Sequence, residues 1–164
     1  MIPLRELANP NDTSVRLYWA YAAAPAVALE FAHVQLRRNP GTILIEAIYA
    51  ADITAAGLVD IFTTAIALPA GVAGTTRNRD GRQAAAVTVV NQATNVAKQT
   101  DGVASYAPQT VPLGAALTSL LHSESETPGA VMGPLILSGP NGVVIIPQTV
   151  NVGITVYFAY RELQ

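Results

Sequence analysis

The chain has 164 residues, of which 51% are hydrophobic and 12% are charged, and its formal net charge is −2. One folded domain is expected at this length, and so small a net charge gives no electrostatic reason to expect a nucleic acid or an anionic membrane as a partner. The absence of cysteine excludes disulfides and thiolate catalysis.

The N-terminal stretch, residues 1–13, predicts an extended arm, because Pro3 and Pro10 oppose regular structure. Three apolar side chains can dock this arm on a neighbouring protein: Ile2, Leu4 and Leu7. The first residues lack the basic and apolar parts of a signal peptide. We therefore expect a soluble chain that is made in the cytoplasm and is not exported by the general secretory route.

The remainder, residues 14–164, is dominated by short apolar segments with a period of two, which is typical of β-strands. The predicted strands cover residues 15–19, 30–36, 42–49, 58–64, 86–91, 135–137, 143–146 and 154–162. Phe31 and Val34 fall on opposite faces of their segment, which indicates a bulge or a twist. Residues 114–121 are the best helix candidate, although a buried strand fits the same residues.

The C-terminal part shows the clearest strand pattern and carries no Asp, Glu, Lys, Arg or His between Thr127 and Tyr160. Residues 138–142 predict a tight turn, since they contain Asn-Gly. In the last strand one face holds Ile154, Val156, Phe158 and Tyr160, and the other holds Thr155, Tyr157, Ala159 and Arg161. A domain with so little charge is expected to cover much of its surface with other protein.

Many short strands with frequent turn signals predict an all-β fold. We expect one antiparallel β-sandwich of the jelly-roll or Greek-key type over residues 14–164, preceded by the extended N-terminal arm.

No constellation of catalytic or metal-binding residues is evident. His33 and His122 alone do not make a zinc site, which needs three or four ligands. Asp52 and Asp60 offer ligands for a hard cation, but turn capping is favoured for each. No nucleophile elbow of the Gly-x-Ser-x-Gly type occurs. The sequence therefore predicts no enzyme, no cofactor and no metal.

Two features favour a role in protein contacts. Glu46 interrupts a strand that otherwise suits burial, so we expect it to pair with an arginine across a sheet or a subunit boundary, or to mark the solvent side of an edge. Aromatic residues group near residues 18–21 and near the C-terminus. The residues expected at a partner or oligomer interface are Ile2, Leu4, Leu7, Trp19, Tyr21, Tyr157 and Tyr160.

With its Pro/Asn-containing arm, charge-poor strands, the turn at residues 138–142 and the strand at 152–162, the chain resembles small auxiliary proteins of tailed-phage virions, the capsid decoration or head-auxiliary class. This resemblance implies a homo-oligomer, with a trimer favoured. It would bind the major capsid protein, or another virion protein, and stabilise the shell. The alternative is a ligand- or receptor-binding β-sandwich, such as a carbohydrate-binding module of a phage neck, tail or spike.

Overall fold

The computed structural model describes residues 15–38, 40–68, 71–79, 86–99, 103–104, 108–114, 117–122 and 135–163. The predicted arm over residues 1–13, with Ile2, Leu4 and Leu7, lies outside these described residues.

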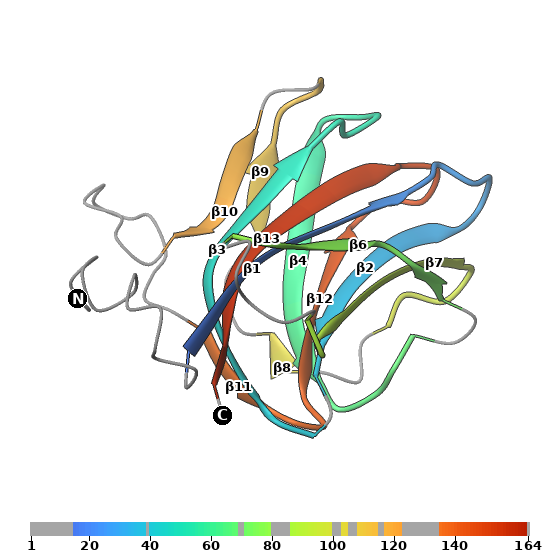
Figure 1. The fold of residues 1–164 in the computed structure, drawn as a ribbon. Helices are drawn as coiled ribbons and strands as arrows, with labels where there is room; N and C mark the ends of the chain where they lie inside the picture. Colours follow the sequence, from blue (N-terminus) through green and yellow to red (C-terminus); the bar gives the residue numbers. More distant parts are fainter. Residues whose placement is uncertain are drawn as a thin grey trace.

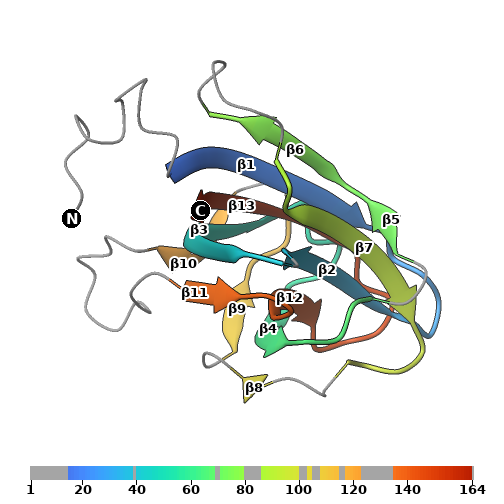
Figure 2. The ribbon, with the colours of Figure 1, turned by 60° about the horizontal axis from the view of Figure 1, so that its bottom comes forward.

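The described residues form two antiparallel sheets that face each other, as Figures 1 and 2 show. Sheet A contains β1 (Val15–Ala24), β3 (Thr42–Ala51), β6 (Thr75–Asn78), β10 (Thr118–His122), β11 (Leu135–Ser138) and β13 (Ile154–Leu163). Sheet B contains β2 (Phe31–Arg37), β4 (Gly57–Thr64), β5 (Val72–Ala73), β7 (Val89–Asn95), β8 (Val103–Ala104), β9 (Gln109–Val111) and β12 (Gly142–Pro147). The predicted all-β sandwich is therefore confirmed.

The strand order is that of a jelly roll. In sheet A the central order is β10-β3-β13-β1, and in sheet B it is β2-β12-β4 with β8 and β9 paired to β4. The chain crosses between the sheets at each step from β1 to β4, and crosses again from β11 to β12 and from β12 to β13. The stretch from β5 to β7 extends both sheets, because β6 pairs with β1 while β5 and β7 lie beyond β2.

The core lies between the sheets and follows the period of two. In β1 the inward residues are Tyr18, Ala20, Ala22 and Ala24, and in β13 they are Ile154, Val156, Phe158 and Tyr160. Tyr18 stacks on Tyr160 with ring centroids 5.5 Å apart. The second face of each strand, with Trp19 and Tyr157, points away from this core.

Two local predictions are corrected. The helix expected over residues 114–121 does not form, since Thr118–His122 is strand β10, paired with β3; this agrees with the alternative of a buried strand. Of the bulge or twist suggested near Phe31 and Val34, the bulge is absent, because β2 pairs with β7 without a register shift. Both faces of β2 are buried because residues 65–68 and 96–99 cover the outer face of sheet B.

Loops gather at one end of the sandwich, along the upper and right rim of Figure 1. This loop end consists of residues 25–30, 52–56, 112–114 and 148–153. The turn between β11 and β12 and the connection between β2 and β3 lie at the opposite end. Among the described residues no helix is long and apolar enough to cross a membrane.

Candidate functional site

The outer face of sheet A carries a row of aromatic side chains across three neighbouring strands. Tyr157 of β13 lies opposite Tyr21 of β1 on one side and Tyr49 of β3 on the other. Thr75 and Ser119 continue the row on the flanking strands β6 and β10. Since adjacent strands are about 4.8 Å apart, this register places the three tyrosines in lateral succession on one surface.

Two of the three tyrosine rings are stacked on each other. Tyr21 and Tyr157 stack with centroids 5.6 Å apart and an interplanar angle of 30°. A stacked pair from neighbouring strands turns its ring faces toward each other, so these faces are covered and the ring edges remain available to a partner. Hydrogen bonds from the side chains of Thr75 and Arg77 lower the pKa of Tyr21. The row is thus an ordered surface of ring edges and polar groups.

An ionic cluster lies beside this row. Glu46 is the extra residue of a bulge in β3, because Ala159 pairs with Ala47 and Tyr160 with Ile45. The bulge directs the Glu46 carboxylate onto the outer face, where it binds Arg161 of β13 and Arg79. The distance from Glu46 Oε2 to Arg79 Nη1 is 2.8 Å. The predicted pairing of Glu46 with an arginine across the sheet is confirmed.

Trp19 is held by the same cluster. The Arg79 guanidinium lies 5.6 Å from the centroid of the indole ring, within range of a cation–π interaction. Trp19 is still 40% exposed, the largest exposed fraction among the aromatic residues of this face. One face of its ring is therefore covered by Arg79, and the remaining surface is accessible to a partner.

The structure brings together three of the expected interface residues, Trp19, Tyr21 and Tyr157, on the outer face of sheet A. The expectation that Tyr160 lies at an interface is wrong, because Tyr160 is fully buried on the core side of β13 and stacked on Tyr18. Tyr49 lies in the same row but is not among the residues expected at an interface. Its place in the row depends on the pairing of β3 with β13, which the chain order does not reveal.

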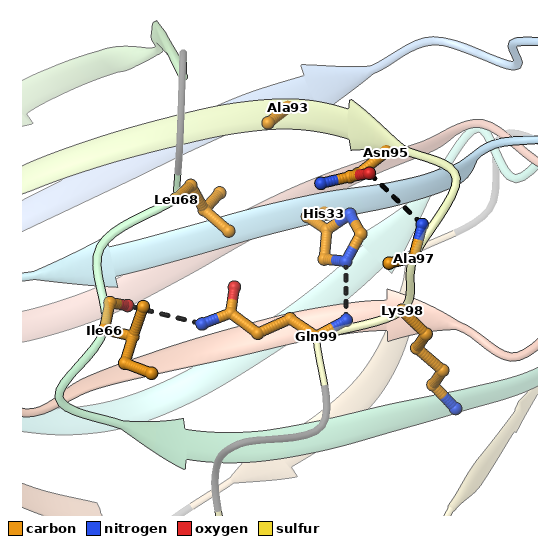
Figure 3. A pocket seen from close by; sticks show the side chains of 8 residues that line it. All are labelled: His33, Ile66, Leu68, Ala93, Asn95, Ala97, Lys98 and Gln99. Atoms are coloured by element: carbon orange, nitrogen blue, oxygen red, sulfur yellow. Dashed lines mark hydrogen bonds between the residues drawn. The ribbon is translucent and has the colours of Figure 1, made fainter.

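A cavity of about 270 Å³ lies on the outer side of sheet B, between the two covering segments (Figure 3). Its lining comprises His33, Ile66, Leu68, Ala93, Asn95, Ala97, Lys98 and Gln99. Leu68 also belongs to a small second cluster with Val144 and Ile146. Two exposed residues, Ile66 and Ala97, form part of the cavity rim.

His33 is buried at the floor of this cavity, with both ring nitrogens engaged. Nε2 accepts the amide N–H of Gln99 at 3.1 Å, which leaves Nδ1 to donate to the carbonyl of Phe31 at 3.0 Å. This tautomer is neutral. Burial lowers the pKa of His33, and the nearby charge of Lys98 lowers it further, while the bond to Phe31 acts in the opposite direction.

Asp60, one of the two aspartates expected to cap turns or to offer cation ligands, lies within strand β4 and has protein partners. The Asp60 carboxylate is buried in sheet B, where it accepts hydrogen bonds from Lys98 and from the Gln148 side chain. Asp52 is exposed in the loop end and has a positive φ of 50°. Within the described ranges no group of three or more His, Cys, Asp or Glu is arranged to hold a metal ion.

No family model, no curated protein and no solved structure matches this chain significantly. A functional role must therefore be inferred from the surface side chains and the cavity. The outer face of sheet A offers aromatic edges, hydroxyl groups and arginines held in place by Glu46, and these residue types are enriched at protein interfaces. The cavity on sheet B is smaller than a typical pocket for a drug-sized ligand.

Proposed function

We propose that this chain is a structural assembly protein, a capsid decoration protein of a tailed phage that oligomerises, preferentially as a trimer, and binds the major capsid protein. The observation that carries the proposal is the stacked pair of Tyr21 and Tyr157 on the outer face of sheet A. The pair lies in a surface whose arginines are already fixed by Glu46. A surface with fixed side chains loses little conformational entropy on binding.

The position of β13 limits how the C-terminal strand can take part. Both of its edges are paired, to β1 and to β3. It therefore contributes to a contact through outward side chains such as Tyr157, and not by adding a strand edge. On this proposal the surface around Tyr157 faces the shell, and the arm at residues 1–13 is a second candidate for anchoring.

Carbohydrate binding, as in a neck, tail or spike module, is the second candidate function. The exposure of Trp19 favours it, and jelly rolls also occur in lectins. A sugar stacks on an open ring face. On this surface Arg79 covers one face of Trp19, and Tyr21 and Tyr157 cover each other. The geometry therefore supports protein binding better than sugar stacking.

The test is co-sedimentation of the purified chain with shells assembled from the major capsid protein of the phage that, on this proposal, encodes it. We expect saturable binding of the wild-type chain, a loss of at least tenfold in affinity for Tyr157→Arg, and wild-type binding for Val72→Ala. Val72 is a suitable control because it is exposed and lies on β5 in the other sheet. Binding of the Tyr157→Arg variant with wild-type affinity would show that the outer face of sheet A does not contact the shell.

A further inference from the structure

Leu29 is an apolar side chain held out into solvent at the loop end. It is 73% exposed, and its backbone has a φ of 66°, in the left-handed region that residues other than glycine rarely adopt. Such a conformation costs roughly 1 kcal/mol or more. A glycine would adopt it without strain, and the leucine gains little burial within its own chain. Folding stability therefore does not explain a leucine at this position.

The neighbouring loops fix this conformation. The amide of Leu29 donates to Oδ1 of Asn151 at 2.6 Å, and the amide of Asn151 donates to the carbonyl of Glu30 at 3.1 Å. Asn151 and Asp52 also have positive φ, so all three non-glycine residues with this backbone conformation, among the described residues, lie at the loop end. Strained residues of this kind concentrate at functional sites.

Hydrogen bonds join the loops of this end to one another. The amide of Thr54 donates to the carbonyl of Gly153, and the amide of Gly153 donates back to Oγ1 of Thr54 at 2.9 Å. The amide of Gly114 donates a hydrogen bond to the carbonyl of Ile53. The Leu29 side chain is therefore presented by a preorganised set of loops, which reduces the entropy lost when it binds.

The same chain offers a pocket of sufficient size. Ile66, Leu68, Ala93 and Ala97 make the apolar part of its lining, and the polar part consists of His33, Asn95, Lys98 and Gln99. An apolar cavity of about 150 Å³ is enough to hold benzene, so the cavity of about 270 Å³ can accept the smaller isobutyl group of a leucine.

We propose that copies of this chain associate by inserting Leu29 of one copy into the cavity formed by Ile66, Leu68, Ala93 and Ala97 of a neighbouring copy. This inference rests on the self-assembly part of the proposed function. A single apolar side chain that enters a pocket on another copy is a known basis of protein association. The rotation between neighbouring copies then decides whether the contacts close into a symmetric cluster.

The experiment is sedimentation velocity on four proteins: wild type, Leu29→Gly, Ala97→Trp and the control Val72→Ala. Leu29→Gly removes the inserted side chain and suits the local φ. Ala97→Trp places a large ring at the exposed rim of the cavity. We expect wild type and Val72→Ala to sediment as a discrete multiple of 17.1 kDa. Each of the other two variants should associate at least about tenfold more weakly, as expected for loss of one buried leucine.

A mixture of Leu29→Gly and Ala97→Trp separates this contact from a general loss of stability. The first variant keeps an open cavity and the second keeps its leucine, so together they retain one complete contact and should form a mixed complex that neither forms alone. Wild-type association of Leu29→Gly, or no mixed complex, would overturn the inference and leave shell binding through sheet A untouched. A wild-type chain that is monomeric at every concentration would also overturn it.

Discussion

Asn151 and Leu29 hold each other in left-handed backbone conformations at the loop end, where the amide of Leu29 lies 2.6 Å from Oδ1 of Asn151. The two residues are far apart in the chain and meet because the β1–β2 loop and the β12–β13 loop lie at the same end of the jelly roll. Asparagine tolerates a positive φ better than leucine does. The strain is therefore concentrated at Leu29, the residue whose side chain points into solvent.

The Leu29→Gly variant should be more stable than the wild-type chain by about 1 kcal/mol, because the strain disappears while little burial is lost. Asn151→Ala should instead be less stable by about 1–2 kcal/mol, since it loses the bond to Leu29 and places alanine at a positive φ. Urea unfolding of both variants measures the two changes. Destabilisation by Leu29→Gly would show that the leucine supports the fold.

Glu46 is expected to stabilise the outer face of sheet A chiefly through Arg161. The Arg161 side chain is only 12% exposed, against 32% for Arg79. Glu46→Ala would leave the poorly solvated Arg161 without its partner, so we expect a loss of about 2 kcal/mol. Arg79→Ala should cost less than about 1 kcal/mol, as is usual for exposed pairs. Chemical denaturation compares the variants, and equal losses would contradict this ranking.

Glu162 anchors the segment that leads into β7. One carboxylate oxygen, Oε1, accepts hydrogen bonds from the amides of Val87 and Thr88 and from the Thr88 hydroxyl, at 2.7–2.8 Å. Glu162 is almost completely buried. Glu162→Ala should therefore cost about 3 kcal/mol, because it leaves buried donors without an acceptor. Glu162→Gln keeps an amide oxygen at this position and should cost clearly less. A similar loss for both variants would mean that the carboxylate charge, and not the hydrogen bonds, matters.

Stability should fall on mild acidification because of His33. Its pKa in the folded protein is lowered from 6.5, so below pH 6.5 the unfolded chain takes up a proton that the folded chain resists. The loss begins as the pH falls through 6.5 and is complete below the lowered pKa of the folded state. Protonation of Nε2 would also remove the acceptor for Gln99 N–H.

Unfolding of wild type and His33→Gln between pH 8 and pH 5 tests this expectation. The glutamine variant lacks the titrating group, so its stability should change less over this interval. Hydrogen exchange should show the Gln99 amide becoming less protected in the wild-type chain as the pH falls. An identical pH dependence in both proteins would exclude His33 as the source.

The sandwich could be predicted from the period of two, but the core side of each strand could not. In β1 both faces are apolar, with Tyr18 and Ala20 on one and Trp19 and Tyr21 on the other. Alternation alone does not distinguish an inner face from an outer face when both carry aromatic residues. Tyr160 was placed at an interface for the same reason. For residues 114–121 the pattern left a helix and a buried strand open, because a short apolar run fits both, and Thr118–His122 is a strand.

The candidate sites depend on contacts between distant parts of the chain. The pairing of Glu46 with an arginine could be anticipated, because a lone carboxylate in an apolar strand needs a partner. The identity of Arg161 and the bulge that aims Glu46 at it follow from the register of β3 and β13. The cavity could not be predicted, since residues 65–68 and 96–99 cover sheet B through bonds from Gln35 and to His33.

Electron cryomicroscopy of capsid shells incubated with the purified chain would show directly whether the chain decorates them and through which face. We expect additional density in symmetric clusters, with the outer face of sheet A, including Tyr157 and Trp19, against the shell. Shells without added density at saturating protein, or clusters attached through sheet B with Tyr157 facing solvent, would contradict it.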